Sequence, residues 1–155
     1  MEADWLNLPD ATYMARVAWR LGLAAILGGL IGVEREVQGK AAGLRTHTMV
    51  SLAAAAFVLV GLETNEDGLG AVIQGIATGV GFLGAGTILK KKEEDGIFGL
   101  TTAATIWLTA AVGVATGAGH GFLALFCVVV AWVVLTILAR LDRRLNSTED
   151  HGTGN

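Results

Sequence analysis

The sequence predicts an all-α integral membrane protein, a helical bundle of about five transmembrane helices. Long uncharged stretches alternate with short charged breaks five times between Ala11 and Arg140. The chain is 53% hydrophobic and 16% charged, with a mean hydropathy of +0.59, which does not fit a soluble domain of 155 residues. An α-helix needs roughly 20 mainly apolar residues to cross a hydrocarbon core about 30 Å thick, and the stretches approach this length.

The first predicted span, residues 12–33, has a helix start at Pro9 and Asp10, and Tyr13 and Trp19 lie near the same end. Amphipathic aromatic rings favour the membrane interface. Because the N-terminus lacks a basic region, we expect this span to be retained and not cleaved as a signal peptide. The other spans cover residues 46–62, 69–89, 99–117 and 120–139 and contain no Asp, Glu, Lys or Arg; the second is the shortest.

Basic residues in the connecting segments predict the orientation. Lysines and arginines follow the first, third and fifth spans, whereas the segment after the second span has only acidic charges. By the positive-inside rule, the N-terminus is outside and the C-terminus is cytoplasmic. Arg16 and Arg20 lie near the outer end of the first span, where long side chains snorkel to the interface. Residues 1–145 are expected to form the membrane domain and residues 146–155 a polar, disordered tail.

Small residues recur at helical spacing on the first and third spans. In lipid, where the hydrophobic effect does not drive helices together, such stripes let helix backbones approach closely. We therefore expect a tight bundle and a homo-oligomer. A G-x-G-x-x-G pattern in the third span lacks the preceding strand of a dinucleotide site. The predicted packing glycines are Gly28, Gly29, Gly32, Gly75, Gly79, Gly81, Gly84 and Gly86.

Charged residues gather where the first span ends. The small-residue stripe continues to Glu36, which we expect to point into the bundle, whereas Glu34 continues a large apolar face and is expected to meet lipid. Two interpretations stay open: a solvated helix end, or a partly buried network that binds a cation, a proton or a partner's charged group. Glu36 is the candidate Mg²⁺ ligand, although Mg²⁺ usually takes more than one carboxylate. The predicted inner-face polar cluster contains Glu34, Arg35, Glu36, Lys40, Arg45 and His47.

Uncharged polar residues lie inside the third and fourth spans. Threonine in a membrane helix either bonds a backbone carbonyl one turn earlier or lines a hydrated path, and both alternatives stay open. Gln74 is the stronger functional candidate, because an amide inside a span needs a partner. The predicted intramembrane polar residues are Arg20, Gln74, Thr78, Thr101, Thr102, Thr105 and Thr109.

An offset of 56 residues aligns the first two spans with the next two. Gly28 then matches Gly84, and Gly43 matches Gly99. Chance similarity is the rival explanation in so apolar a chain. The alignment predicts two repeated helical hairpins in parallel orientation, followed by a fifth helix.

No catalytic constellation is evident in the sequence. Ser51 has only His47 one turn away and no evident orienting acid, and the three histidines do not have zinc-like spacing. Cys127 is the single cysteine and is expected to be packing. We therefore expect no enzyme and no cofactor, with Mg²⁺ as the one candidate ion.

Four ordered blocks carry a family resemblance. They are LGGLIGVERE at 27–36, Lys40 with AGLRTH at 42–47, GVGFLGAGTIL at 79–89 and GLTTAATIWLTAAVG at 99–113. Over residues 20–144 the chain resembles the MgtC/SapB family of bacterial inner-membrane proteins. The resemblance implies a multi-pass protein associated with growth under magnesium limitation, in a family linked to control of membrane complexes such as the F-type ATP synthase. Many members also have a C-terminal ACT-type domain, and we expect only the transmembrane domain here.

Three classes of function follow. The favoured one is a non-enzymatic regulator in magnesium-linked homeostasis that binds other membrane proteins in the bacterial inner membrane. The alternative is a transporter or channel for Mg²⁺ or another cation, lined by Glu36, Gln74 and the threonines, although spans two to five lack carboxylates. An intramembrane enzyme is the weakest. The expected partners are the lipid bilayer and a membrane protein, not nucleic acid.

Overall fold

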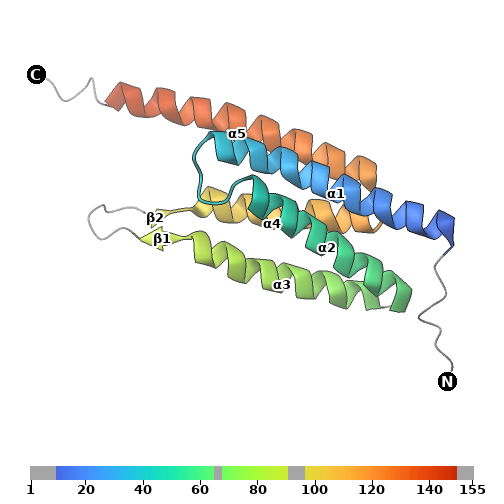
Figure 1. Ribbon diagram of the computed structural model, residues 1–155. Coiled ribbons are helices and arrows are strands. Elements are labelled where there is room, and N and C mark those ends of the chain that lie inside the picture. Colours follow the sequence, from blue (N-terminus) through green and yellow to red (C-terminus); the bar gives the residue numbers. More distant parts are fainter. Residues whose placement is uncertain (1–9, 65–67, 91–96, 150–155) are drawn as a thin grey trace, which may run out of the picture.

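Five α-helices make up most of the molecule. The computed structural model describes the backbone of residues 10–64, 68–90 and 97–149. All five helices are long and apolar enough to cross a membrane, which confirms the predicted all-α class and the five spans. They are α1 (Ala11–Val37), α2 (Leu44–Thr64), α3 (Leu69–Thr87), α4 (Leu100–Gly117) and α5 (Gly121–Glu149), with β1 (Leu89–Lys90) and β2 (Ile97–Phe98) paired antiparallel between α3 and α4 (Figure 1).

The helices run up and down, so the connections lie at two ends of the bundle (Figure 1). Residues 38–43, β1 and β2 lie at one end, which we call the strand end. The α2–α3 and α4–α5 connections lie at the other, which we call the turn end. Helix α5 includes residues 146–149, the first part of the expected tail; residues 150–155 lie outside the described residues.

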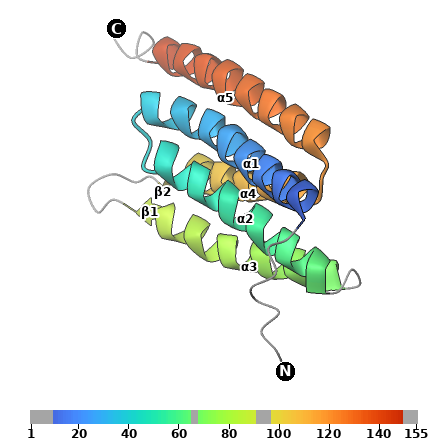
Figure 2. The ribbon, with the colours of Figure 1, turned by 45° about the vertical axis from the view of Figure 1, so that its right-hand side comes forward.

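Helix α4 is the centre of the bundle. It contacts each of the other four helices, whereas α3 and α5 lie at opposite edges (Figure 2). In the membrane-spanning part of α4, 56% of the residues are buried, whereas in that of α3 only 6% are buried. One apolar cluster joins α1, α4 and α5 around Leu27 and Val112, and another joins α2, α3 and α4 around Ala54 and Ile106.

Glycines set the close spacing of α2 against its neighbours. A Cβ at Gly32 would lie 2.7 Å from the Leu44 Cα, and one at Gly117 would lie 2.7 Å from the Ala55 carbonyl oxygen. Gly28 and Gly29 also face α2, where the Ser51 and Thr48 side chains are the nearest, as the predicted packing role of the α1 glycines requires. Among the α3 glycines only Gly84 meets a neighbouring helix of the described chain, at Ala103.

Two features agree with the predicted repeat. Helices α2 and α4 begin at Leu44 and Leu100, which are 56 residues apart. Gly28 packs against the backbone at His47, and the aligned Gly84 packs against the aligned Ala103. Equivalent contacts at equivalent positions are expected from repeated hairpins, whereas chance similarity of apolar sequence does not predict them.

Candidate functional site

Ionisable and polar side chains are buried at the strand end, between α1 and α2. Helix α1 continues past its apolar part, which places Glu34 and Arg35 one turn before its end. Gly32 lets α2 approach so closely that a Cβ there would lie 3.1 Å from the His47 Cβ. Arg35 is 2% exposed, Glu34 is 9% exposed, and His47 and Ser51 are fully buried. We call Glu34, Arg35, His47 and Ser51 the buried polar cluster.

Arg35 and Glu34 form an ion pair within this cluster. The Arg35 Nη1 lies 3.7 Å from the Glu34 Oε2, and the other Glu34 oxygen accepts a hydrogen bond from the Gln38 amide. Buried charges are costly unless they are paired, which explains why the two residues occur together. Within the described residues, Arg35 Nε and Nη2, Glu34 Oε2 and Ser51 Oγ have no hydrogen-bond partner.

His47 is held in one tautomer. Its Nδ1 donates a hydrogen bond to the Gly43 carbonyl oxygen at 2.9 Å, because a carbonyl can only accept. In the neutral ring the proton is therefore on Nδ1, and the buried Nε2 carries a lone pair without a partner in the described residues. This arrangement suits a proton acceptor or a ligand atom. Glu34 and Arg35 are near enough for their charges to act on the ring.

The expected directions of the two glutamates are wrong. Glu36 is exposed, and its Oε2 accepts the backbone N–H of Leu44 at 2.9 Å, so it caps the start of α2. Glu34, expected toward lipid, is buried. The physical reason is that α1 packs against α5 as well as α2, so its buried face is wider than the glycine stripe alone.

The predicted inner-face polar cluster therefore divides into two groups. Glu34, Arg35 and His47 are buried together, whereas Glu36, Lys40 and Arg45 are exposed. Ser51 belongs to the buried group and was missed as a site residue, although its spacing of one helical turn from His47 was a usable signal. Glu34 is engaged with Arg35 and Gln38, and Glu36 with α2, so these two carboxylates do not form a pair for Mg²⁺. Among the described residues no group of three or more His, Cys, Asp or Glu could hold a metal ion.

Two of the predicted threonines of α4, Thr105 and Thr109, follow the first of the two alternatives. Thr105 donates to the Thr102 carbonyl oxygen and Thr109 to the Thr105 carbonyl oxygen, each at 2.8 Å. Thr102, Thr105 and Thr109 are buried, while Thr101 is exposed at the strand end. Hydroxyls that satisfy their own helix do not need a hydrated path.

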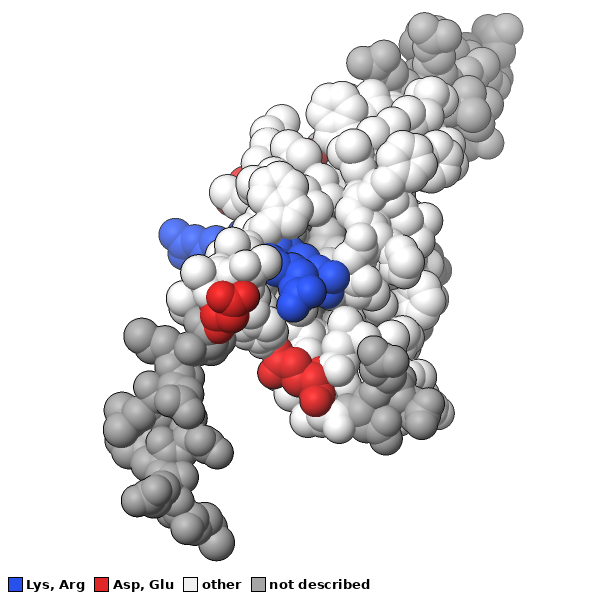
Figure 3. Space-filling model, turned by 90° about the vertical axis from the view of Figure 1, so that its right-hand side faces the viewer, with Lys and Arg blue, Asp and Glu red and all other residues white. Residues whose placement is uncertain are grey.

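Arg20 joins α1 to α4 at the turn end. Its Nη1 donates to the Gly117 carbonyl oxygen at 2.8 Å, so a cation sits at the C-terminus of α4, where the helix dipole favours it. Gly119 lies against the guanidinium with a φ of +87°, and a Cβ there would be 2.7 Å from Nη2. Figure 3, which faces this end, shows a few charges of both signs on an otherwise uncharged surface.

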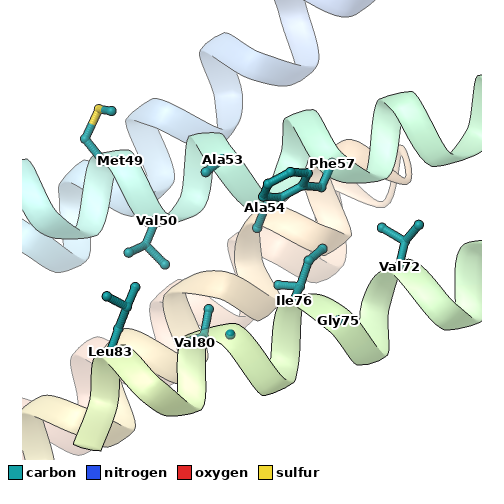
Figure 4. Close-up of a pocket in the computed structure, with 11 residues that line it drawn as sticks. Met49, Val50, Ala53, Ala54, Phe57, Val72, Gly75, Ile76, Val80 and Leu83 are labelled. Carbon is teal, nitrogen blue, oxygen red and sulfur yellow. The ribbon is translucent and has the colours of Figure 1, made fainter. Parts of the chain in front are cut away.

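Helix α3 presents an unfilled face. Gly75, Gly79, Gly81 and Gly86 have nothing within 4 Å of a Cβ position, so within the described residues no other helix of this chain packs on them. Gly75 and Gly79 line an apolar groove of about 680 Å³ between α2 and α3, and Figure 4 shows its apolar side chains. Gln74 and Thr78 are exposed on the same helix; Thr78 donates to the Gln74 carbonyl oxygen at 2.9 Å.

The helices and the charged residues buried at one end define a small multi-pass membrane protein. Residues 21–144 match the MgtC family, and the chain belongs to this bacterial family of membrane proteins. It is 39% identical to protein SrpB of Synechococcus elongatus, and the match covers 92% of this chain and 80% of SrpB. No solved structure matches the chain.

Two other relatives are longer than the chain. One is named "Putative magnesium transporter YhiD" in Escherichia coli K12 and is 41% identical over 141 residues, 85% of this chain and 65% of YhiD. The other is protein MgtC of Salmonella typhimurium LT2, 39% identical over 123 residues, 79% of this chain and 52% of MgtC. The chain thus spans about half of MgtC and somewhat less than two thirds of YhiD.

Proposed function

We propose that the protein is a non-enzymatic regulator in magnesium-linked homeostasis, and that it acts in the bacterial inner membrane by binding another membrane protein through α3. The observation that supports this is the unfilled face of α3. Small residues at a spacing of four, Gly75 and Gly79, are left open beside an apolar groove. This is the surface that a neighbouring transmembrane helix fills.

Polar groups on α3 support a protein partner over lipid alone. The Gln74 side chain is exposed on a membrane-spanning helix and has no hydrogen-bond partner among the described residues. Lipid chains cannot form hydrogen bonds with this amide, whereas a partner helix can. Each interhelical hydrogen bond stabilises the association by about 1 kcal/mol. A second copy that uses the same face would give the expected homo-oligomer.

The buried polar cluster argues against a cation pathway through the bundle. A cation that entered from the strand end would meet the Arg35 guanidinium, which is 2% exposed. Glu34 is already paired with that arginine, and the Thr105 and Thr109 hydroxyls are bonded to their own helix. Charge repulsion by Arg35 and the pairing of the Glu34 carboxylate with that arginine both disfavour Mg²⁺.

Transport of Mg²⁺ or another cation is the alternative. It is supported by the name of the YhiD relative and by the Glu34 Oε2 and His47 Nε2, which have no hydrogen-bond partner among the described residues. Flux into sealed liposomes that contain the purified protein tests it. We expect no saturable Mg²⁺ flux above protein-free liposomes. Saturable flux that disappears in Glu34→Gln, while Glu36→Gln retains it, would replace the regulator proposal with a transporter.

The regulator proposal is tested by Gly79→Leu, which fills the open face of α3. Because nothing lies within 4 Å of that position, we expect unchanged thermal stability in detergent. We expect loss of growth in magnesium-poor medium when the variant replaces the natural copy. Gly22→Leu is the matched control, since Gly22 is an equally open glycine on α1. Normal growth of Gly79→Leu, or equal loss with Gly22→Leu, would contradict a specific α3 surface.

A further inference from the structure

A second pocket lies at the strand end, separate from the α3 face. It has a volume of about 230 Å³ and lies between α1, α4 and α5. Polar groups line one side, and apolar side chains of α5 line the other. The lining residues are Arg35, Gln38, Lys40, Thr101, Val134, Leu135 and Leu138.

Arg35 lines this pocket, and part of its guanidinium has no hydrogen-bond partner among the described residues. Its Nη1 is directed to Glu34, while Nε and Nη2 have no partner among the described residues and the side chain is 2% exposed. Nε–H and the adjacent Nη2–H point in parallel, and such a fork binds two oxygens of one phosphate or carboxylate. Because a buried polar group is costly unless it is hydrogen-bonded, a fork with no partner among the described residues favours a ligand that supplies two oxygens.

Every other polar group of the pocket also offers a donor. Lys40 supplies an ammonium and Thr101 a hydroxyl, and the Gln38 amide has a second N–H besides the one it donates to Glu34. Thr101 lies in the first turn of α4, whose start has no side-chain cap, so the positive end of that helix dipole is at the pocket. Donors, positive charge and a helix start together select an anion.

The two glutamates described at this end, Glu34 and Glu36, do not occupy this position. Glu34 pairs with Arg35 through Nη1 and lines a different groove, between α1 and α5. Glu36 bonds to the Leu44 N–H at the start of α2. Neither carboxylate lines the pocket, where two cationic side chains remain.

We propose that the pocket between α1, α4 and α5 binds a phosphate group through the Nε and Nη2 of Arg35, the ammonium of Lys40 and the hydroxyl of Thr101. The pocket lies where α1 ends and α4 begins, so it is at the depth of lipid headgroups, and basic pockets between transmembrane helices bind anionic headgroups. The phosphate comes from an anionic phospholipid or from free inorganic phosphate. The proposal is independent of the α3 partner surface.

Binding is measured as the shift of the thermal unfolding midpoint of the full chain in an uncharged detergent. One arm adds inorganic phosphate against sodium chloride of equal ionic strength, and the other adds phosphatidylglycerol against phosphatidylcholine. Arg35→Lys keeps the charge beside Glu34 but removes the fork, and Lys40→Gln removes one cation. We expect each variant to weaken binding at least about tenfold. Arg45→Gln is the control, because Arg45 is exposed and does not line the pocket.

Saturable stabilisation by phosphate alone would identify a free-anion site, and stabilisation only by phosphatidylglycerol would identify a headgroup site; both support the proposal if the pocket variants weaken it. If neither probe stabilises the protein, the pocket holds water and the proposal is wrong. It is equally wrong if Arg45→Gln weakens binding as much as Lys40→Gln, since that result indicates unspecific attraction to a basic surface.

Discussion

The hairpin of α1 and α2 and the hairpin of α3 and α4 can be compared position by position at the predicted offset of 56 residues, and the two hairpins bury different side chains. Position 47 is a buried histidine in the first hairpin, and its equivalent in the second is Ala103. Ser51 is buried, whereas its equivalent, Trp107, is 54% exposed. The first hairpin thus encloses ionisable groups, and the second turns a side of α3 outward. One helical framework supports both a charged interior and a membrane-facing surface.

The closeness of the helices explains much of this difference. Helix α1 touches the α2 backbone through Gly28 and Gly32, so the polar side chains beyond these glycines are shut away from lipid. The contact at Gly84 is looser, with 3.5 Å between a Cβ there and the Ala103 Cβ. Loose packing in the second hairpin leaves the α3 glycines available to another helix.

The largest effect is expected from the buried ion pair of Arg35 and Glu34 in the first hairpin. Within the described residues the second hairpin has no equivalent pair. Arg35→Met leaves Glu34 buried without a counter-charge, which should destabilise the fold by about 3–5 kcal/mol. The double variant with Glu34→Gln removes both charges and should recover most of that loss. Reversible unfolding in mixed detergent micelles measures both values. A loss below about 1 kcal/mol in Arg35→Met would show that Glu34 reaches water or another cation.

The two aligned glycines give the next test. Gly28→Ala places a Cβ 2.8 Å from the His47 carbonyl oxygen, and this overpacking should destabilise the protein by about 2–3 kcal/mol. In Gly84→Ala the new Cβ would be at ordinary van der Waals distance from Ala103, and alanine has a higher helix propensity than glycine. This variant should therefore be neutral or slightly stabilising. Both variants are compared by the same unfolding measurement. Equal losses would mean that the hairpins are equally tight.

Arg20 tests the contact between the two hairpins, because it lies on α1 and bonds to the end of α4. Arg20→Met removes the charged hydrogen bond to the Gly117 carbonyl oxygen and should lower the free energy of unfolding by about 1–2 kcal/mol. Arg16→Met is the control; Arg16 is exposed, lies 5.7 Å from the Tyr13 ring, and should matter by less than about 0.5 kcal/mol. A neutral Arg20→Met would indicate that water replaces the guanidinium.

The spans could be predicted because length and lack of charge are local properties. The same holds for the glycines of α1, whose spacing identifies a contact face. The α3 glycines have that spacing too, but a stripe does not say whether its partner helix belongs to the same chain. Within the described residues, Gly84 is the only α3 glycine that packs against another helix of the same chain.

The glutamates show why the site was harder to predict. The small-residue stripe predicts the direction of the Glu36 side chain only if α1 packs against a single neighbouring helix. Helix α1 instead meets α5 on its other side, and this brings Glu34 into the interior. The turn at residues 38–43 then places Leu44 where the Glu36 carboxylate caps it. Long-range packing decides both outcomes.

The smallest effect is expected at the two aligned helix starts. Glu36 caps α2, whereas the start of α4 at Gly99 has no side-chain cap. Glu36→Ala should therefore cost about 1 kcal/mol, and Glu36→Gln should cost less because its amide oxygen still accepts the Leu44 N–H. If Glu36 instead binds Mg²⁺, added Mg²⁺ should stabilise the natural protein but not Glu36→Gln. We expect the same response to Mg²⁺ in both, since a carboxylate engaged with a helix start is a poor ligand for a cation that demands several oxygens.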